Sequence, residues 1–161
     1  MSKAQKHREA ALPVEDQTFI ALLKAADALA QEAEQVFKGK GLTGAQYNVL
    51  RILRGAEPGG LACSTIGERM ISHDPDITRL LDRMEKRRLI TRQRQSDDRR
   101  VVKTRITPSG LEILKRLEKP IRELHKHQFQ HMAAARVKTL AELLREIVQR
   151  HGEGQFVSGT K

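Results

Sequence analysis

Two strand-like runs joined by a charged turn follow directly on a short amphipathic helix pattern between residues 74 and 110. From Arg79 to Arg105 this segment carries eleven Lys or Arg residues against four Asp or Glu residues. It therefore holds +7 of the chain's formal net charge of +10. A basic helix followed at once by a basic hairpin is typical of a winged helix-turn-helix that binds a polyanion. The segment thus favours a protein that binds double-stranded DNA.

The composition of the chain limits its class and its location. A length of 161 residues predicts one domain, or a small domain with extensions. No apolar run is long enough to cross a bilayer, and the N-terminus lacks the apolar core of a signal peptide. The single cysteine excludes an internal disulfide and fits a reducing cytoplasm. Five aromatic residues, with no Trp, argue against a single-strand or RNA-binding surface, where bases stack on aromatic rings.

Apolar periodicity predicts long helices at both ends of the chain. Residues 15–38 carry one apolar stripe, and residues 108–150 carry two more, with a bend expected at Pro120. These stripes could simply cover a winged-helix core. That core is small, however, and three long helices offer more apolar surface than it can bury. The excess favours helices that dimerise.

The expected fold class is mainly α: a winged helix-turn-helix with a two-stranded wing, between N- and C-terminal dimerisation helices. The DNA-binding lobe is assigned to residues 43–107, and its first helix is expected to begin with a Thr-x-x-Gln capping box at Thr43. Residues 1–14 and 152–161 are expected to be loose termini. The whole chain is therefore interpreted as a single domain.

The first part of the charged segment predicts a helix with one apolar and one charged face. Asp74 is expected to cap it, and Pro75 to occupy its first position. Apolar residues recur at i, i+3, i+4 and i+7, which makes a buried stripe of Ile77, Leu80, Leu81 and Met84. The charged side chains of Arg79, Asp82, Arg83 and Lys86 share the opposite face, with Asp76 on its flank. Taken alone, such a face either meets DNA or is merely solvated.

A second short helix is expected just before this one, over residues 64–70, where Ser64 and Thr65 could each serve as the cap. Two helices across a turn form a helix-turn-helix, whose second helix enters the major groove. Asp76 then has two interpretations. Its negative charge either stabilises the start of the helix by interacting with the helix dipole, or its carboxylate accepts a hydrogen bond from a cytosine amino group.

The hairpin that follows makes simple solvation a poor explanation. Residues 89–95 and 101–107 are expected to form its strands, around a tip at residues 96–100. On the second strand Lys103 and Arg105 share one face, while Val102, Thr104 and Ile106 share the other. On the first strand Arg92 and Arg94 also share a face. A basic hairpin directly behind a basic helix favours a DNA-binding wing.

From residue 15 to about residue 148 the sequence resembles the MarR family of winged-helix transcription regulators. Three stretches carry the resemblance: Leu42, Thr43, Gln46 and Leu50 at a helix opening; the run Ile77–Glu85 as recognition helix; and Asp98, Arg99, Arg100, Thr107 and Gly110 as wing signature. The wing signature is the most specific of the three. Arg88 departs from the pattern, because the family usually has glycine there, so the turn after the recognition helix is expected to differ. Ala62 also stands where a Ser or Thr cap is common.

The resemblance implies roles for individual residues. Arg100 corresponds to the family's wing-tip arginine, which enters the minor groove, and Asp98 to the aspartate that braces it. Arg92 corresponds to an arginine at the base of the wing. The resemblance further implies a homodimer of interlocked terminal helices, and a small aromatic or phenolic effector bound between those helices and the DNA-binding lobe. Repression is the family's commonest mode.

The function expected is therefore that of a cytoplasmic, homodimeric, sequence-specific regulator that an effector releases. Symmetry implies a pseudo-palindromic double-stranded operator with half-sites about one helical turn apart. The DNA-binding residues expected are Ser64, Thr65, Asp76, Thr78, Arg79, Arg83, Lys86, Arg92, Arg94, Asp98, Arg99, Arg100 and Lys103. The alternatives are a sequence-independent nucleoid protein and a non-DNA interaction module. The operator, the effector and the sign of regulation stay open.

Other chemistry in the sequence is thin. His127 and His131 have a spacing that could hold zinc, but their basic neighbours would repel a cation. Cys63 fits a small buried filler better than a peroxide sensor. No catalytic arrangement, phosphate loop or paired metal-ligand motif supports an enzyme. No cofactor, metal or membrane partner is expected.

Overall fold

The computed structural model describes residues 12–56, 58–72, 76–94 and 102–152. Its elements follow in the order α2 (Val14–Lys38), α3 (Gly44–Arg54), β1 (Leu61–Ala62), α4 (Cys63–Arg69), α5 (Ile77–Lys86), β2 (Ile90–Arg94), β3 (Val102–Ile106), α6 (Pro108–Phe129) and α7 (Ala134–Gly152). Most of the described residues are helical, so the mainly α class is confirmed. In this part of the chain, no helix combines the length and the apolarity that a membrane span requires.

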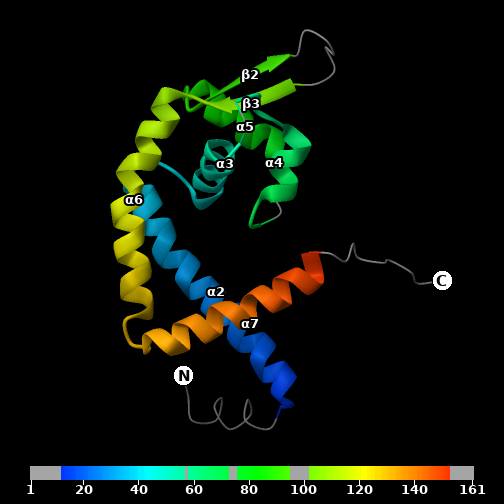
Figure 1. The fold of residues 1–161 in the computed structure, drawn as a ribbon. Coiled ribbons are helices and arrows are strands. Elements are labelled where there is room, and N and C mark those ends of the chain that lie inside the picture. The colour runs from blue at the N-terminus through cyan, green and yellow to red at the C-terminus, as the bar shows by residue number, and fades with distance from the viewer. Residues whose placement is uncertain (1–11, 57, 73–75, 95–101, 153–161) are drawn as a thin grey trace, which may run out of the picture. The chain divides into compact units, whose positions relative to one another are not determined.

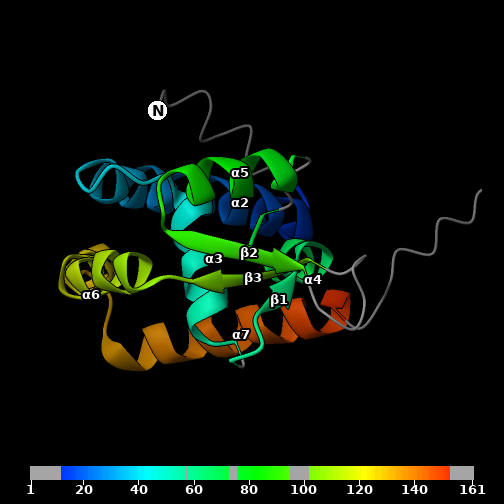
Figure 2. The same cartoon turned by 90° about the horizontal axis from the view of Figure 1, so that it is seen from above.

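The sheet has three antiparallel strands in the order β1-β3-β2. The β2–β3 hairpin confirms the expected wing, and Figure 2 shows β3 between the other two strands. β1 is a third strand that the sequence did not predict, because a run of two residues is too short to show alternation. Gly60 brings β1 alongside β3. Its φ is +76°, and a Cβ there would lie 2.6 Å from the carbonyl oxygen of Thr104.

Of the first three helices, α3 alone begins with a side-chain cap. α2 begins after Pro13, as expected. α3 has the expected capping box, since Thr43 Oγ1 accepts from the Gln46 amide at 3.3 Å and Gln46 Oε1 accepts from the Thr43 amide at 3.2 Å. α4 has no side-chain cap and begins after Ala62. The suggestion that Ser64 or Thr65 caps this helix was therefore wrong, because both lie within its first turn.

The described residues fall into two compact units, one up to Arg122 and the other from Glu123. The core of the first unit consists of apolar residues that are at most 6% exposed: Leu42, Val49, Leu50, Leu53, Ile66, Leu80, Leu81, Met84, Leu89, Ile90, Leu114, Leu117 and Ile121. Figure 1 shows α3, α4 and α5 gathered beside the β2–β3 hairpin. This core includes the apolar stripe predicted for α5, except that Ile77 is only half-buried.

The long terminal helices keep much of their apolar surface exposed in the single chain. On α2, Phe19 is 62% exposed and Leu23 is 55% exposed. On α7, which belongs to the second unit, Leu143, Ile147 and Val148 are also exposed. α6 runs from the first unit into the second and continues through Pro120 without interruption. Apolar faces of this kind are typical of surfaces that pair with another chain.

α5 begins two residues later than the sequence predicted. Its cap is Asp76, whose Oδ1 accepts from the Arg79 amide at 3.3 Å, and its first residue is Ile77. The expectation that Asp74 caps this helix was therefore wrong. Asp74 and Pro75 lie outside the described residues. Asp74 and Asp76 offer the same capping chemistry two residues apart, and the apolar periodicity of the helix cannot choose between them.

α5 ends in the turn that glycine usually provides, although Arg88 occupies the left-handed position with φ of 56°. The Arg88 amide donates to the Glu85 carbonyl at 2.8 Å, and the Leu89 amide donates to the Met84 carbonyl at 3.0 Å. These two bonds make the Schellman pattern. The expectation that Arg88 changes this turn was wrong, because the paired bonds hold the arginine in a conformation that costs it about 1–2 kcal/mol.

The start of α6 is fastened to this turn. Thr107 Oγ1 donates to the carbonyl oxygens of Arg88 and Leu89, at 2.7 and 3.0 Å, and accepts from the Gly110 amide at 3.0 Å. Gly110 has no room for a side chain, because a Cβ would lie 2.4 Å from the Leu89 carbonyl oxygen. The Thr107 and Gly110 pair of the wing signature thus fixes where α6 leaves the hairpin.

Candidate nucleic-acid interface

α5 presents a basic exposed face opposite its buried stripe. Thr78, Arg79, Arg83 and Lys86 are exposed, whereas Leu80, Leu81 and Met84 are buried. The separation follows from the 3.6-residue helical period. The structure therefore brings four of the predicted DNA-binding residues together on one side of the helix.

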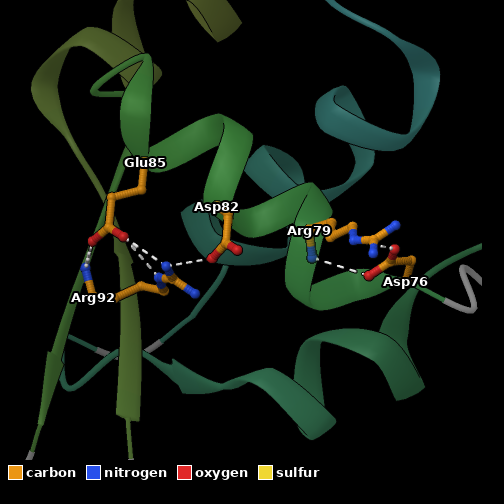
Figure 3. A network of polar contacts seen from close by, with 5 residues as sticks. All are labelled: Asp76, Arg79, Asp82, Glu85 and Arg92. Atoms are coloured by element: carbon orange, nitrogen blue, oxygen red, sulfur yellow. Dashed lines mark hydrogen bonds and ion pairs between the residues drawn. The ribbon is translucent and has the colours of Figure 1, made fainter.

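The N-terminal end of α5 holds an arginine and a carboxylate together (Figure 3). Asp76 Oδ2 lies 3.2 Å from Arg79 Nε, while its other oxygen caps the helix. The Arg79 side chain is 78% exposed, and that of Asp76 is 48% exposed. A pair this open contributes little to stability, but it limits the orientations of the guanidinium. Asp76 thereby acts on Arg79 as well as on the helix end.

The base of the wing is tied to α5 by Arg92, as Figure 3 shows. Its Nη2 lies 2.5 Å from Asp82 Oδ1 and 2.8 Å from Glu85 Oε2. Its Nε also donates to Glu85 Oε2, at 2.9 Å, and its backbone amide donates to Glu85 Oε1 at 3.0 Å. Four contacts from one residue, on β2, thus hold two carboxylates that lie one turn apart on α5.

The electrostatics of this cluster keep the arginine charged. Hydrogen bonding to Glu85, with a smaller contribution from Asp82, raises the pKa of the Arg92 guanidinium above its already high value, although partial burial opposes the shift. The Arg92 side chain is 25% exposed, less than that of Arg79. The guanidinium therefore keeps its charge at any working pH and is directed at protein carboxylates.

The two faces of the hairpin carry different groups. Residues that pair across the strands share a face, so Arg92 lies with Thr104, and Gln93 lies with Lys103. Gln93 Oε1 also accepts from Arg105 Nη1 at 3.1 Å on that second face. Arg94 is exposed and Lys103 is half-buried. The expected alternation of Lys103 and Arg105 against Thr104 is confirmed, but the basic residues of the wing divide between both faces.

The remaining predicted contacts lie on α4 and at the wing tip. Ser64 is exposed and Thr65 is half-buried in the first turn of α4, next to the half-buried Cys63. Asp98, Arg99 and Arg100 lie outside the described residues, together with the rest of the segment between β2 and β3.

Two carboxylates of the site were missed or misplaced by sequence reasoning. Asp82 was assigned to the open charged face of α5, and Glu85 was given no role, yet both bind Arg92. A usable signal was present. Ile90, two residues before Arg92, is a strand residue whose side must face the core, so Arg92 shares the side that meets α5. Strand alternation could therefore have directed this arginine toward Asp82 and Glu85.

Metal-ligand chemistry receives no support from the described residues. Within them, no three His, Cys, Asp or Glu side chains gather in a way that could hold an ion. The His127 ring nitrogen Nδ1 lies 2.8 Å from Gln130 Nε2, a contact between neighbours on α6 and its following turn.

Comparisons with known proteins agree with this geometry. A family model described as "MarR family" matches residues 42–102, which run from just before α3 to the first residue of β3. The HTH-type transcriptional repressor IacR of Pseudomonas putida is 30% identical over 81% of this chain and 77% of its own length. The homoprotocatechuate degradative operon repressor of Escherichia coli is 28% identical over 83% of this chain and 88% of its own length.

A solved structure extends the similarity to the fold. The MarR transcription factor of Planctomyces limnophilus is 38% identical and superposes with a TM-score of 0.64. The match covers 81% of this chain and 94% of that protein. Both the sequence and the fold are therefore similar along most of the chain.

Proposed function

This chain belongs to the MarR family of dimeric DNA-binding transcriptional regulators, and we propose that it represses transcription from a pseudo-palindromic operator until an effector releases it. The observation that carries the proposal is the exposed basic face of α5, held at the base of the wing by Arg92. Such a face fits the major groove, and the wing then reaches the adjacent groove. A regulator of this kind would work in the cytoplasm, where its operator lies.

The α5 residues divide into base readers and phosphate contacts. Arg79 and Arg83 have the fork that binds guanine O6 and N7, and each such contact is worth about 1–3 kcal/mol of discrimination. Thr78 lies beside them near the helix start. Lys86, at the C-terminal end of α5, is proposed as a phosphate contact. Reading and positioning are thus assigned to different turns of one helix.

Asp76 is proposed to act mainly through Arg79. Both of its carboxylate oxygens have partners within the protein, one at the helix start and one on the arginine. A cytosine amino group would have to share or displace them. Direct reading of cytosine by Asp76 stays the competing prediction.

Arg92 is proposed to support DNA binding as a positioning residue. Its guanidinium is directed at Asp82 and Glu85, which fixes the angle between α5 and the wing. Ser64, Thr65, Arg94 and Lys103 are proposed as sequence-independent phosphate contacts, since hydroxyl and basic groups commonly serve that purpose. Loss of a charged phosphate contact at Arg94 or Lys103 should lower the salt dependence of DNA binding, whereas loss of Arg92 should leave it unchanged.

The wing tip is assigned from its sequence motif. Arg100 is proposed to enter a narrow A·T-rich minor groove, where negative potential is concentrated, with Asp98 bracing its fork and Arg99 adding a phosphate contact. The resemblance carries this assignment, because these residues lie outside the described part of the chain.

The dimer is proposed to form through the exposed apolar faces of the terminal helices. Phe19 and Leu23 on α2, with Ile147 and Val148 on α7, are each more than 40% exposed in the single chain. The name of one relative connects it with an operon for the degradation of homoprotocatechuate, a phenolic carboxylic acid. That name supports an aromatic or phenolic carboxylate as effector here.

The function can be tested by titrating the region upstream of the protein's own gene against random duplex DNA of equal length, at several salt concentrations. A specific regulator is expected to prefer the upstream region by about a thousandfold or more. Arg83→Ala should reduce that preference, and phenolic acids should release the protein. Equal affinity for both DNAs with a steep salt dependence would instead support the nucleoid alternative.

A further inference from the structure

Gln46 is a polar side chain at the junction between α3 and the end of α5. It is only 7% exposed. Its Oε1 accepts from the Thr43 amide and from Arg87 Nη1, each at 3.2 Å. A buried amide oxygen needs such donors, and a bond from a charged donor is stronger than a neutral one. Gln46, the third helical residue of α3 and part of its capping box, therefore also binds Arg87, the residue that ends α5.

A second contact continues from this junction to α2. The Gly44 amide, at the first position of α3, donates to Glu34 Oε2 at 2.8 Å. Arg87 also lies over the turn between α2 and α3, where its Nη2 is 3.6 Å from the position a Cβ on Gly41 would take. Two polar contacts therefore meet at the first turn of α3, one from Glu34 on α2 to the Gly44 amide and one from Arg87 at the end of α5 to Gln46.

We propose that Gln46 and Arg87 are positioning residues that set the direction of the recognition helix relative to α2, and so the spacing of half-sites that the dimer accepts. The inference rests on the proposed function, in which α2 joins two chains and α5 enters DNA. α5 is only about 15 Å long, so a small rotation at its C-terminal end moves its reading face across the groove. A polar connection at that end fixes this rotation.

The competing role for Arg87 is a direct phosphate contact. Its residue is exposed, and it carries a charge beside Lys86. The two roles differ in their consequences. A lost phosphate contact lowers the salt dependence of binding and weakens every DNA alike. A lost positioning contact changes the preference among operators whose half-sites are spaced differently.

The test uses the full chain and three duplexes. One is a palindrome selected from a random library by the wild-type protein, and the others have one base pair added or removed between the half-sites. Gln46→Met and Arg87→Met break the connection. Gln46→Glu keeps both the capping box and an acceptor for Arg87. Arg116→Met is the charge control, since it removes an exposed arginine on α6 whose ion pair is with Glu112, one turn away on the same helix.

Both methionine variants are expected to lower the affinity ratio of correct to shifted spacing by about 2- to 30-fold, the range seen for residues that modulate coupling. Gln46→Glu and Arg116→Met should keep the wild-type ratio. Arg87→Met, a surface change, keeps the test decisive even where Gln46→Met folds poorly.

Two results would overturn the inference in different ways. An unchanged ratio in Arg87→Met, with a salt slope reduced by about 0.9 for each lost contact, would make Arg87 a phosphate contact. That result would leave the proposed regulator intact. A wild-type protein that binds all three duplexes equally would overturn the specific regulator itself, and the positioning role with it.

Discussion

Replacing Arg92 with methionine keeps most of the aliphatic length of the side chain and removes the group that joins the wing to α5. Three side-chain contacts are lost, from Nε and Nη2 to Asp82 and Glu85, at 2.5 to 2.9 Å. The bond from the Arg92 amide to Glu85 does not need the side chain. The change therefore loosens the angle between α5 and the wing but keeps the hydrogen bond from the Arg92 amide to Glu85.

The expected cost follows from how open the partners are. The Asp82 side chain is 42% exposed and that of Glu85 is 37% exposed, so both carboxylates can be hydrated once the arginine is gone. Solvent screening then brings the loss in free energy of unfolding to about 1–2 kcal/mol, between values for exposed pairs and for shielded charged hydrogen bonds. Because the pKa of Arg92 is raised, its charge and this contribution persist throughout the working pH range.

Salt dependence separates positioning from direct contact. Operator affinity is expected to fall in Arg92→Met with an unchanged slope of log affinity against log salt. In the control Lys86→Met the slope should decrease by about 1.8, for one phosphate-neutralising charge in each subunit of the dimer. The assay is fluorescence anisotropy on the selected palindrome at five salt concentrations, with thermal unfolding in parallel. Undiminished stability together with a slope reduced by about 1.8 would refute the positioning role and make Arg92 a phosphate contact.

Four further changes test other parts of the structure. Gly110→Ala should destabilise the chain by about 1–3 kcal/mol in thermal unfolding, because its Cβ would meet backbone 2.4 Å away; higher stability would mean that the helix start can move. Arg88→Gly should stabilise the chain by about 0.5–1 kcal/mol, because glycine relieves the strain of the left-handed backbone but loses more conformational entropy on folding. An unchanged melting temperature would contradict that strain. Phe19→Asp should give folded monomers by light scattering, whereas a mass still twice that of the chain would exclude this face from the dimer. Asp98→Ala should weaken operator binding as Arg100→Ala does, despite adding positive charge, and tighter binding to every DNA would reject the bracing role.

The helices of this fold were predictable because their chemistry is local. The apolar stripe of α5 and the capping box at Thr43 depend on residues three or four apart, and both are present. The start of α5 was misplaced because Asp74 and Asp76 offer the same capping chemistry. β1 was missed because its position depends on Gly60 approaching Thr104, a contact between residues more than forty positions apart.

The turn at Arg88 failed for a different reason. Intrinsic preference argues against a left-handed arginine, and the glycine that the family usually has at this position made the arginine look like a change of turn. The structure outweighs this preference with two amide bonds that close the end of α5 and with Thr107, which donates to the Arg88 carbonyl from nineteen residues away. A tertiary hydrogen bond of that range leaves no local pattern.

The acidic residues of the site bear on the choice between a specific regulator and a nucleoid protein. Asp76, Asp82 and Glu85 place three negative charges on or beside a helix that is proposed to meet phosphate. A binder that relied on charge alone would gain affinity by losing all three. Each of them instead contacts an arginine, and two of the three also bind a backbone amide. These contacts fix the geometry of α5 but weaken its positive electrostatic field. Such an exchange helps only a protein that must distinguish one base sequence from another, because contacts with base edges depend on orientation far more than contacts with phosphates do.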